Sequence, residues 1–153
     1  MRILMVCLGN ICRSPLAEGI LKHRANEKGI DLFVDSAGTG FWHVGQKPDK
    51  RSIAVAEKNG IDITYQRSRL FKKEDFQEFD LIYAMDENNI NELLKKTKND
   101  EEKQKIKLIM NEIYPGQNIP VPDPYYGGDS GFDEVFQMLN LVAEKILTDI
   151  ETI

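Results

Sequence analysis

A cysteine and an arginine six positions apart, Cys7 and Arg13, are the residues of this chain best suited to chemistry. A thiolate is a nucleophile, and a guanidinium holds two phosphate oxygens in its planar, permanently charged fork. The five residues between them, Leu8 to Cys12, suffice for the backbone to encircle a tetrahedral dianion with its amides pointing inward. Gly9 lets this backbone approach the anion because it has no Cβ. The pattern therefore predicts a phosphate-binding loop that contains its own nucleophile.

The elements on either side of this loop strengthen the prediction. The apolar run from Arg2 to Leu8 predicts a strand that is buried on both faces. Helix signals follow, with Ser14 as a possible cap, Pro15 at the first helical position and Gly29 as the stop. A helix N-terminus favours anions and lowers a thiol pKa from about 8.5 to roughly 3.5–7.5. We therefore expect Cys7 to be a thiolate at neutral pH.

Cleavage of a phosphate monoester also needs an acid for the leaving oxygen, and Asp123 is the best candidate. Prolines on both sides, Pro122 and Pro124, stiffen the backbone and can fix the carboxyl group over the site. The alternative is an aspartate that only forms a turn. With Cys7 in the same chain, the acid is the favoured interpretation.

Strand and helix patterns alternate along the rest of the chain. Further strands are expected at Asp31 to Ser36, Asp80 to Met85 and Ile106 to Met110. Further helices are expected to open at Pro48-Asp49, at Asp86, and at Ser130, where Asp133 completes a capping-box pattern. This alternation predicts an α/β fold with a parallel sheet covered on both faces. In such a fold the active site is expected beyond the carboxyl ends of the strands.

Composition limits the classes of protein to consider. The 153 residues predict one domain, 1–153, and a net charge of −5 argues against nucleic-acid and anionic-membrane partners. Two cysteines indicate thiols in a reducing compartment rather than a disulfide framework. The apolar run from Ile3 to Leu8 is too short for a signal peptide or a membrane span. We therefore expect a cytoplasmic monomer.

Three segments together resemble the low-molecular-weight protein tyrosine phosphatases: CLGNICRSP at 7–15, SAGT at 36–39 and DPYYGG at 123–128. They have the order and separations of that family, and the resemblance spans nearly the whole chain. It implies a doubly wound, four-stranded parallel sheet with the phosphate-binding loop between the first strand and the first helix. It also implies hydrolysis of phosphotyrosine in proteins and peptides, and of small aryl phosphates, without a metal or cofactor.

The resemblance assigns a role to each residue of the site. Cys7 would attack phosphorus to give a cysteinyl-phosphate, and Arg13 would stabilise the transferring group. Asp123 would protonate the departing phenolate and then serve as the base for the hydrolytic water. The phosphate would be bound by one continuous segment made of Leu8, Gly9, Asn10, Ile11, Cys12, Arg13 and Ser14.

Supporting residues follow from the same resemblance. Ser14 would donate a hydrogen bond to the Cys7 sulfur, and Asn10 would hold the loop by hydrogen bonds that include one to Ser36. Many relatives have a histidine where this chain has Gln66, which leaves open how this network is supported. A disulfide between Cys7 and Cys12 under peroxide would match a redox brake of the family. A small buried residue is an equally good interpretation of Cys12.

The substrate ring would lie between Trp42 and Tyr125, with Tyr126 completing the rim, and such stacking contributes about 0.5–1.5 kcal/mol. Two other activities are alternatives for this loop. A thiol-dependent arsenate reductase would need further cysteines late in the chain, and none follows Cys12. A protein-arginine phosphatase is a closer alternative, but relatives with that activity carry threonine at the position of Ile11 and lack the paired tyrosines. Binding of phosphate without turnover disagrees with the presence of both Cys7 and Asp123.

Overall fold

A single parallel sheet forms the centre of the fold. The computed structural model describes residues 1–125 and 127–152, and its strands are β1 (Arg2–Cys7), β2 (Phe33–Gly38), β3 (Leu81–Ala84) and β4 (Ile106–Leu108). Their order across the sheet is β2-β1-β3-β4, and all three pairings are parallel. The predicted α/β class and doubly wound architecture are therefore confirmed.

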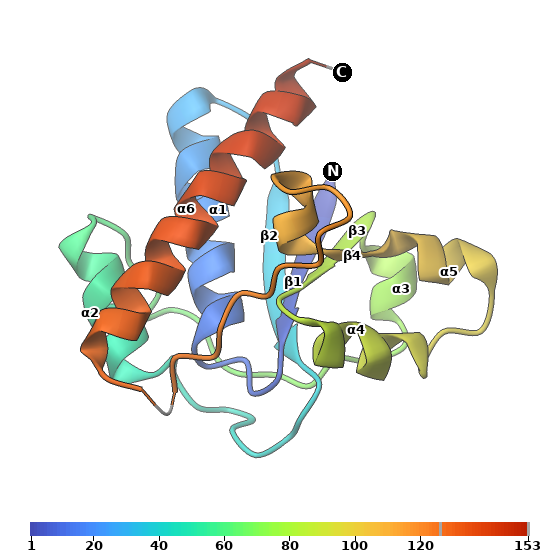
Figure 1. The fold of residues 1–153 in the computed structure, drawn as a ribbon, viewed down its shortest axis with the longest axis horizontal. Helices are drawn as coiled ribbons and strands as arrows, with labels where there is room; N and C mark the ends of the chain where they lie inside the picture. Colours follow the sequence, from blue (N-terminus) through green and yellow to red (C-terminus); the bar gives the residue numbers. More distant parts are fainter. Residues whose placement is uncertain (126, 153) are drawn as a thin grey trace.

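Helices cover both faces of this sheet (Figure 1). On one side lie α1 (Arg13–Lys28), α2 (Lys50–Lys58) and α6 (Asp129–Glu151), and on the other lie α3 (Asp75–Glu78), α4 (Glu87–Leu94) and α5 (Asp100–Lys105). Alternate residues of β1 enter two separate cores. Met5 and Cys7 pack into the core beneath α1 and α6, whereas Leu4 and Val6 pack into the smaller core beneath α3 and α4. Burial on both faces explains why β1 is a continuous apolar run.

Helix α1 confirms one of its predicted boundaries and corrects the other. Gly29 caps its C-terminus in the left-handed conformation, with a φ of 68°, which glycine adopts without strain. At the other end, Ser14 is not the N-cap: α1 begins at Arg13, and Cys12 precedes it without a side-chain cap. Ser14 lies inside the first turn because its hydroxyl contacts Cys7 and Asn10 instead.

Of the other predicted helix starts, two are confirmed and one is wrong. Helices α2 and α4 begin where predicted, and Asp49 and Asp86 cap them by accepting hydrogen bonds from the backbone amides of Arg51 and Asn89. The capping box predicted at Ser130 is wrong, since α6 already includes Asp129 and no side chain caps it. Helix α6 buries an apolar stripe that comprises Phe132, Val135, Phe136, Leu139, Val142 and Ile146.

Strand boundaries shift by at most two residues. β2 begins at Phe33 rather than Asp31, and β4 ends at Leu108, after which Ile109–Glu112 forms a 3-10 helix. Two short helices, α3 and α5, were not predicted, because four and six residues are too few to show a helical period.

The carboxyl ends of the parallel strands point toward one end of the molecule. The chain begins at the opposite end, where α6 also finishes (Figure 1). Among residues 1–125 and 127–152, no helix has both the length and the apolar composition to span a bilayer. In a parallel α/β sheet a site is expected at the carboxyl ends of the strands, which is the end that carries the strand-to-helix connections.

Candidate active site

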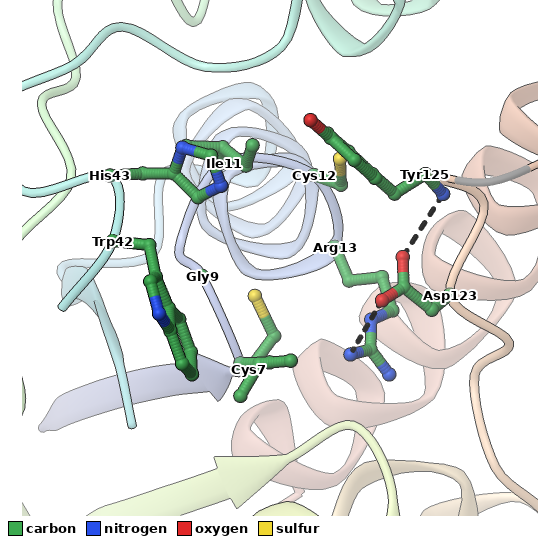
Figure 2. Close-up of a pocket in the computed structure, with 10 residues that line it drawn as sticks. Cys7, Gly9, Ile11, Cys12, Arg13, Trp42, His43, Asp123 and Tyr125 are labelled. Atoms are coloured by element: carbon green, nitrogen blue, oxygen red, sulfur yellow. Dashed lines mark hydrogen bonds and ion pairs between the residues drawn. The ribbon is translucent and has the colours of Figure 1, made fainter. Parts of the chain in front are cut away.

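A pocket of about 300 Å³ opens where β1 passes into α1 (Figure 2). Cys7, the last residue of β1, lies at its base and is only 3% exposed. The lining comes from the connections that follow β1 and β2 and from the proline-rich loop that contains Asp123: Cys7, Leu8, Gly9, Ile11, Cys12, Arg13, Trp42, His43, Asp123 and Tyr125.

The loop of residues 8–12 turns its carbonyl groups outward. The carbonyl oxygen of Leu8 accepts from the Gly40 amide at 2.8 Å, that of Gly9 from the Ser68 hydroxyl at 2.9 Å, and that of Ile11 from the Asp49 amide at 2.8 Å. In contrast, the amides of residues 8–12 have no acceptor within the part of the chain that the structure describes. Backbone donors without an acceptor at the start of a helix form an anion site.

The sulfur of Cys7 has a hydrogen-bonding neighbour at the base of the pocket. Its Sγ lies 3.0 Å from the Oγ of Ser14, and the side-chain amide of Asn10 donates to the same Oγ at 2.8 Å. Since the Ser14 oxygen already accepts a hydrogen bond from Asn10, its own hydrogen is available to the sulfur. This arrangement suits a thiolate acceptor.

Asn10 determines the shape of the loop. Its backbone adopts a left-handed conformation, with a φ of 55°, which asparagine tolerates better than most residues. The side chain fixes this conformation from both ends, because Nδ2 also donates to Ser36 Oγ at 2.9 Å and Oδ1 accepts from the Arg69 amide at 3.0 Å. The expected hydrogen bond from Asn10 to Ser36 is therefore present.

Glu18 supports this network from behind, a role that the sequence analysis did not identify. The carboxylate, 2% exposed, accepts from Ser36 Oγ at 2.7 Å, from Lys22 Nζ at 2.8 Å and from the Tyr65 hydroxyl at 2.9 Å. Burial lowers the pKa of Lys22, but the hydrogen bond and charge of Glu18 outweigh this and raise it above its usual value. Gln66 instead donates to the Pro15 carbonyl at 3.0 Å.

Arg13 is held in a fixed position beside the pocket. Its Nη1 donates to Asp86 Oδ2 at 2.6 Å and to the Val121 carbonyl at 3.0 Å, while Nη2 lies 3.8 Å from Asp123 Oδ2 (Figure 2). Burial lowers its pKa, but the negative groups of Cys7, Asp86 and Asp123 together raise it above its usual value. The guanidinium therefore stays charged.

Asp86 is a second residue whose role was missed. It was predicted only as the cap of α4, and its Oδ1 does accept from the Asn89 amide at 2.8 Å. Its other oxygen binds Arg13. The available signal was its place at the carboxyl end of β3, the same edge of the sheet as the phosphate-binding loop.

Asp123 faces the pocket from the proline-rich loop, and both of its oxygens have neighbours. Oδ2 points toward Arg13, and Oδ1 accepts from the Tyr125 amide at 3.0 Å (Figure 2). The turn-forming hydrogen bond considered as an alternative is thus present together with the orientation into the pocket. One carboxyl group makes both contacts.

Aromatic side chains form the rim. Trp42 and Tyr125 lie on opposite sides of the pocket, and Tyr125 contributes to its lining from the loop after Asp123 (Figure 2). Trp42 is 62% exposed. His43 also lines the pocket, which the sequence analysis did not predict, and its Nδ1 lies 3.1 Å from Gln46 Oε1. Tyr126 lies outside the described residues.

Cys12 differs from Cys7 in its surroundings. Burial, followed by the negative charges of Asp49 and other neighbours, raises the pKa of the Cys12 thiol well above its usual range. Both cysteines are free thiols, so a disulfide between them stays a prediction. Within residues 1–125 and 127–152, no cluster of three or more His, Cys, Asp or Glu side chains is arranged to hold a metal ion.

Comparison with known proteins matches this geometry to one family. Residues 2–152 match the sequence profile described as low molecular weight phosphotyrosine protein phosphatase. The chain is 41% identical over 152 residues to a putative low molecular weight protein-tyrosine-phosphatase of Synechocystis, with 98% of this chain and 96% of that protein covered.

Solved structures agree with the sequence match. A protein tyrosine phosphatase of Entamoeba histolytica superposes with a TM-score of 0.92 at 38% identity, covering 99% of this chain and 97% of that one. A Drosophila arginine phosphatase superposes with a TM-score of 0.91 at 34% identity, covering 98% of each chain.

Proposed function

The chain belongs to the low molecular weight phosphotyrosine protein phosphatase family, and on this premise we propose that it hydrolyses phosphotyrosine and small aryl phosphates with Cys7 as the nucleophile. The observation that carries the proposal is the position of Cys7 at the base of a pocket that is lined by the loop of residues 8–12, whose amides have no acceptor among the described residues. A phosphate dianion satisfies these donors and brings its phosphorus above the sulfur.

The first step transfers the phosphoryl group to the enzyme. The Cys7 thiolate attacks phosphorus, a sulfur–phosphorus bond forms, and the bond from phosphorus to the aryl oxygen breaks. Asp123, protonated at this stage, gives its proton to the departing oxygen. The loop amides and Arg13 bind the equatorial oxygens, where negative charge is spread in the transition state.

The second step regenerates the enzyme. A water molecule attacks the phosphorus of the cysteinyl-phosphate, and the Asp123 carboxylate accepts its proton. The sulfur–phosphorus bond breaks, inorganic phosphate leaves, and the thiolate is restored. Ser14 assists by donating to the leaving sulfur, from the 3.0 Å contact described above.

The rim supports an aromatic ester as the substrate. Trp42 and Tyr125 present apolar rings on two sides of the pocket mouth, and a phenyl ring between them buries its faces. Ile11 adds an apolar side chain to the lining. A guanidinium-linked phosphate would instead be surrounded by these apolar groups, so phosphoarginine is the less suitable substrate.

Turnover of p-nitrophenyl phosphate tests the mechanism. Cys7→Ser should abolish it, a chelator should leave it unchanged, and rapid quenching of the unmodified enzyme should trap phosphate on Cys7. Matched peptides that carry phosphotyrosine or phosphoarginine then test the substrate. Faster release of phosphate from phosphoarginine would overturn the substrate assignment, whereas turnover by Cys7→Ser would overturn the mechanism.

A phosphotyrosine-containing protein or peptide is the expected partner. The monomeric state and the cytoplasmic location expected from the sequence stay predictions.

A further inference from the structure

A second hollow opens directly beside the active-site pocket. It has a volume of about 1060 Å³, and its lining consists of Leu8, Thr39, Gly40, Trp42, Asn88, Asn91, Glu92, Leu94, Lys95 and Lys103. We call it the α4 groove. Leu8 and Trp42 line both the α4 groove and the active-site pocket, so the two spaces share a wall. A chain bound at the pocket mouth can continue into the groove across these two side chains.

One face of α4 forms the length of the groove. Asn88, Asn91, Glu92 and Lys95 follow one another at helical spacing, so they form a single stripe from the first turn of α4 to its C-cap. At about 1.5 Å per helical residue the stripe is roughly 10 Å long, which is the length of about three residues of extended peptide.

Two asparagines in this stripe, Asn88 and Asn91, lie on the exposed surface of α4. The side chains of Asn88 and Asn91 are exposed, and neither makes a hydrogen bond to any residue of the described chain. Asparagine is less favourable in a helix than alanine, glutamate or lysine. Asn89 is explained by its capping box with Asp86, but the other two are not. A side-chain amide offers one acceptor and two donors, which suits the backbone of a bound peptide.

Apolar and basic side chains complete the groove. Leu8 is 44% exposed and Leu94 is 38% exposed, and together with Trp42 they place three large apolar side chains around one hollow. Such a grouping is typical of an interaction site. Lys95, the C-cap of α4, and Lys103 of α5 add two positive charges to the lining, against one negative charge from Glu92, which pairs with Lys95 at 3.0 Å.

We propose that the α4 groove binds the polypeptide segment that flanks the phosphotyrosine of the substrate. This inference rests on the proposed function, because the phosphotyrosine must occupy the neighbouring pocket. An apolar residue next to the phosphotyrosine would contact Leu8 and Trp42. The peptide backbone would pair with Asn88 and Asn91, and an acidic residue about three or four positions from the phosphotyrosine would reach the lysines.

The test compares two substrates on the same protein variants. p-Nitrophenyl phosphate fills only the pocket, whereas phosphotyrosine peptides with an aspartate three or four positions before or after the phosphotyrosine also fill the groove. The variants are Asn88→Ala/Asn91→Ala and Lys95→Glu. Matched controls lie at the opposite end of the molecule: Asn26→Ala, an exposed helical asparagine of α1, and Lys145→Glu, which like Lys95 pairs with an acidic neighbour on its own helix.

We expect both groove variants to hydrolyse p-nitrophenyl phosphate like the unmodified protein. For the preferred acidic peptide, kcat/KM should fall roughly three- to tenfold for each amide that loses a hydrogen bond. Lys95→Glu should lower it about threefold, and less at high salt. The control variants should leave kcat/KM unchanged for both substrates.

Unchanged peptide kcat/KM in both groove variants would overturn the proposal, as would equal losses with both substrates. Failure of the unmodified protein to hydrolyse p-nitrophenyl phosphate would instead contradict the proposed function, so the two failures are distinguishable.

Discussion

The Oγ of Ser14 lies 3.0 Å from the Sγ of Cys7 and accepts a hydrogen bond from Asn10. This relationship links the nucleophile to the residue that shapes the phosphate-binding loop.

Ser14→Ala should lower kcat for p-nitrophenyl phosphate by roughly 10- to 100-fold, because a hydrogen bond to a charged sulfur contributes more than one between neutral groups. KM should change little, since the loop amides are retained. Ser52→Ala is a matched control: Ser52 is equally buried and contacts the loop at the Cys12 carbonyl, but it does not touch the sulfur. Equal losses of kcat in the two variants would contradict a specific role for Ser14.

Asp123→Asn should lower kcat by about 10²- to 10⁴-fold with phenyl phosphate, whose leaving group needs a proton. The loss should be smaller with p-nitrophenyl phosphate, because p-nitrophenolate leaves more readily. Asparagine can still accept from the Tyr125 amide, so a loss that is independent of the leaving group would indicate that Asp123 acts only on the loop.

Gly40→Ala should displace the indole of Trp42. A Cβ at Gly40 would lie 2.0 Å from an atom of that ring, whereas a Cβ at Gly128, the control position, meets nothing within 4 Å. We expect KM for aryl phosphates to rise in Gly40→Ala with a smaller change in kcat. Trp42 is the single tryptophan of the chain, so its fluorescence reports the displacement directly. An unchanged emission spectrum would contradict this prediction.

Tyr65→Phe should lower the free energy of unfolding by about 1 kcal/mol, less than the roughly 1.5–3 kcal/mol of a buried hydrogen bond to a charged group, because Tyr65 is half exposed. Since Glu18 holds Ser36, and Ser36 in turn holds Asn10, kcat should also fall moderately. Urea unfolding and steady-state kinetics measure the two effects. Tyr114→Phe, a tyrosine remote from the pocket lining, is the control.

Stability should fall as the pH rises above about 9, partly because of Cys12. Burial raises the pKa of the folded Cys12 thiol above its ordinary value of 9.0. The unfolded chain therefore loses this proton at a pH where the folded chain retains it, and stability falls by up to about 1.4 kcal/mol per pH unit. Below about pH 9 the thiol keeps its proton in both the folded and the unfolded chain, so Cys12 causes no loss of stability there.

Cys12→Ala should accordingly show a smaller decrease in the free energy of unfolding between pH 9 and pH 10 than the unmodified protein. Comparing slopes rather than absolute stabilities removes the cost of the lost side chain. Equal slopes in the two proteins would contradict the assignment to Cys12.

The alternation of strands and helices was readable from the sequence because each carries a distinct hydrophobic period. The strand-to-helix turn at residues 7–13 was readable because glycine, cysteine and arginine have clear physical roles there. The ends of the helices were harder to predict. Ser14 and Ser130 both have the residue type of a cap, and only tertiary contacts determine that Ser14 faces the sulfur instead.

Partners that are distant in sequence were not readable at all. Asp86 binds Arg13 across 73 positions, and Tyr65 reaches Glu18 across 47. For each of these residues, the neighbouring sequence suggests a role that does not involve its distant partner. The α4 groove was missed for the same reason, since its stripe is a plain polar helix face until Leu8 and Trp42 are placed beside it.

The position of β1 inside the sheet, between β2 and β3, has a consequence for heat inactivation. Cys7 ends a strand that is hydrogen-bonded on both sides, so its backbone cannot be released by fraying at an edge. Loss of turnover and loss of circular dichroism on heating should therefore coincide, with no temperature range in which a folded but inactive enzyme accumulates.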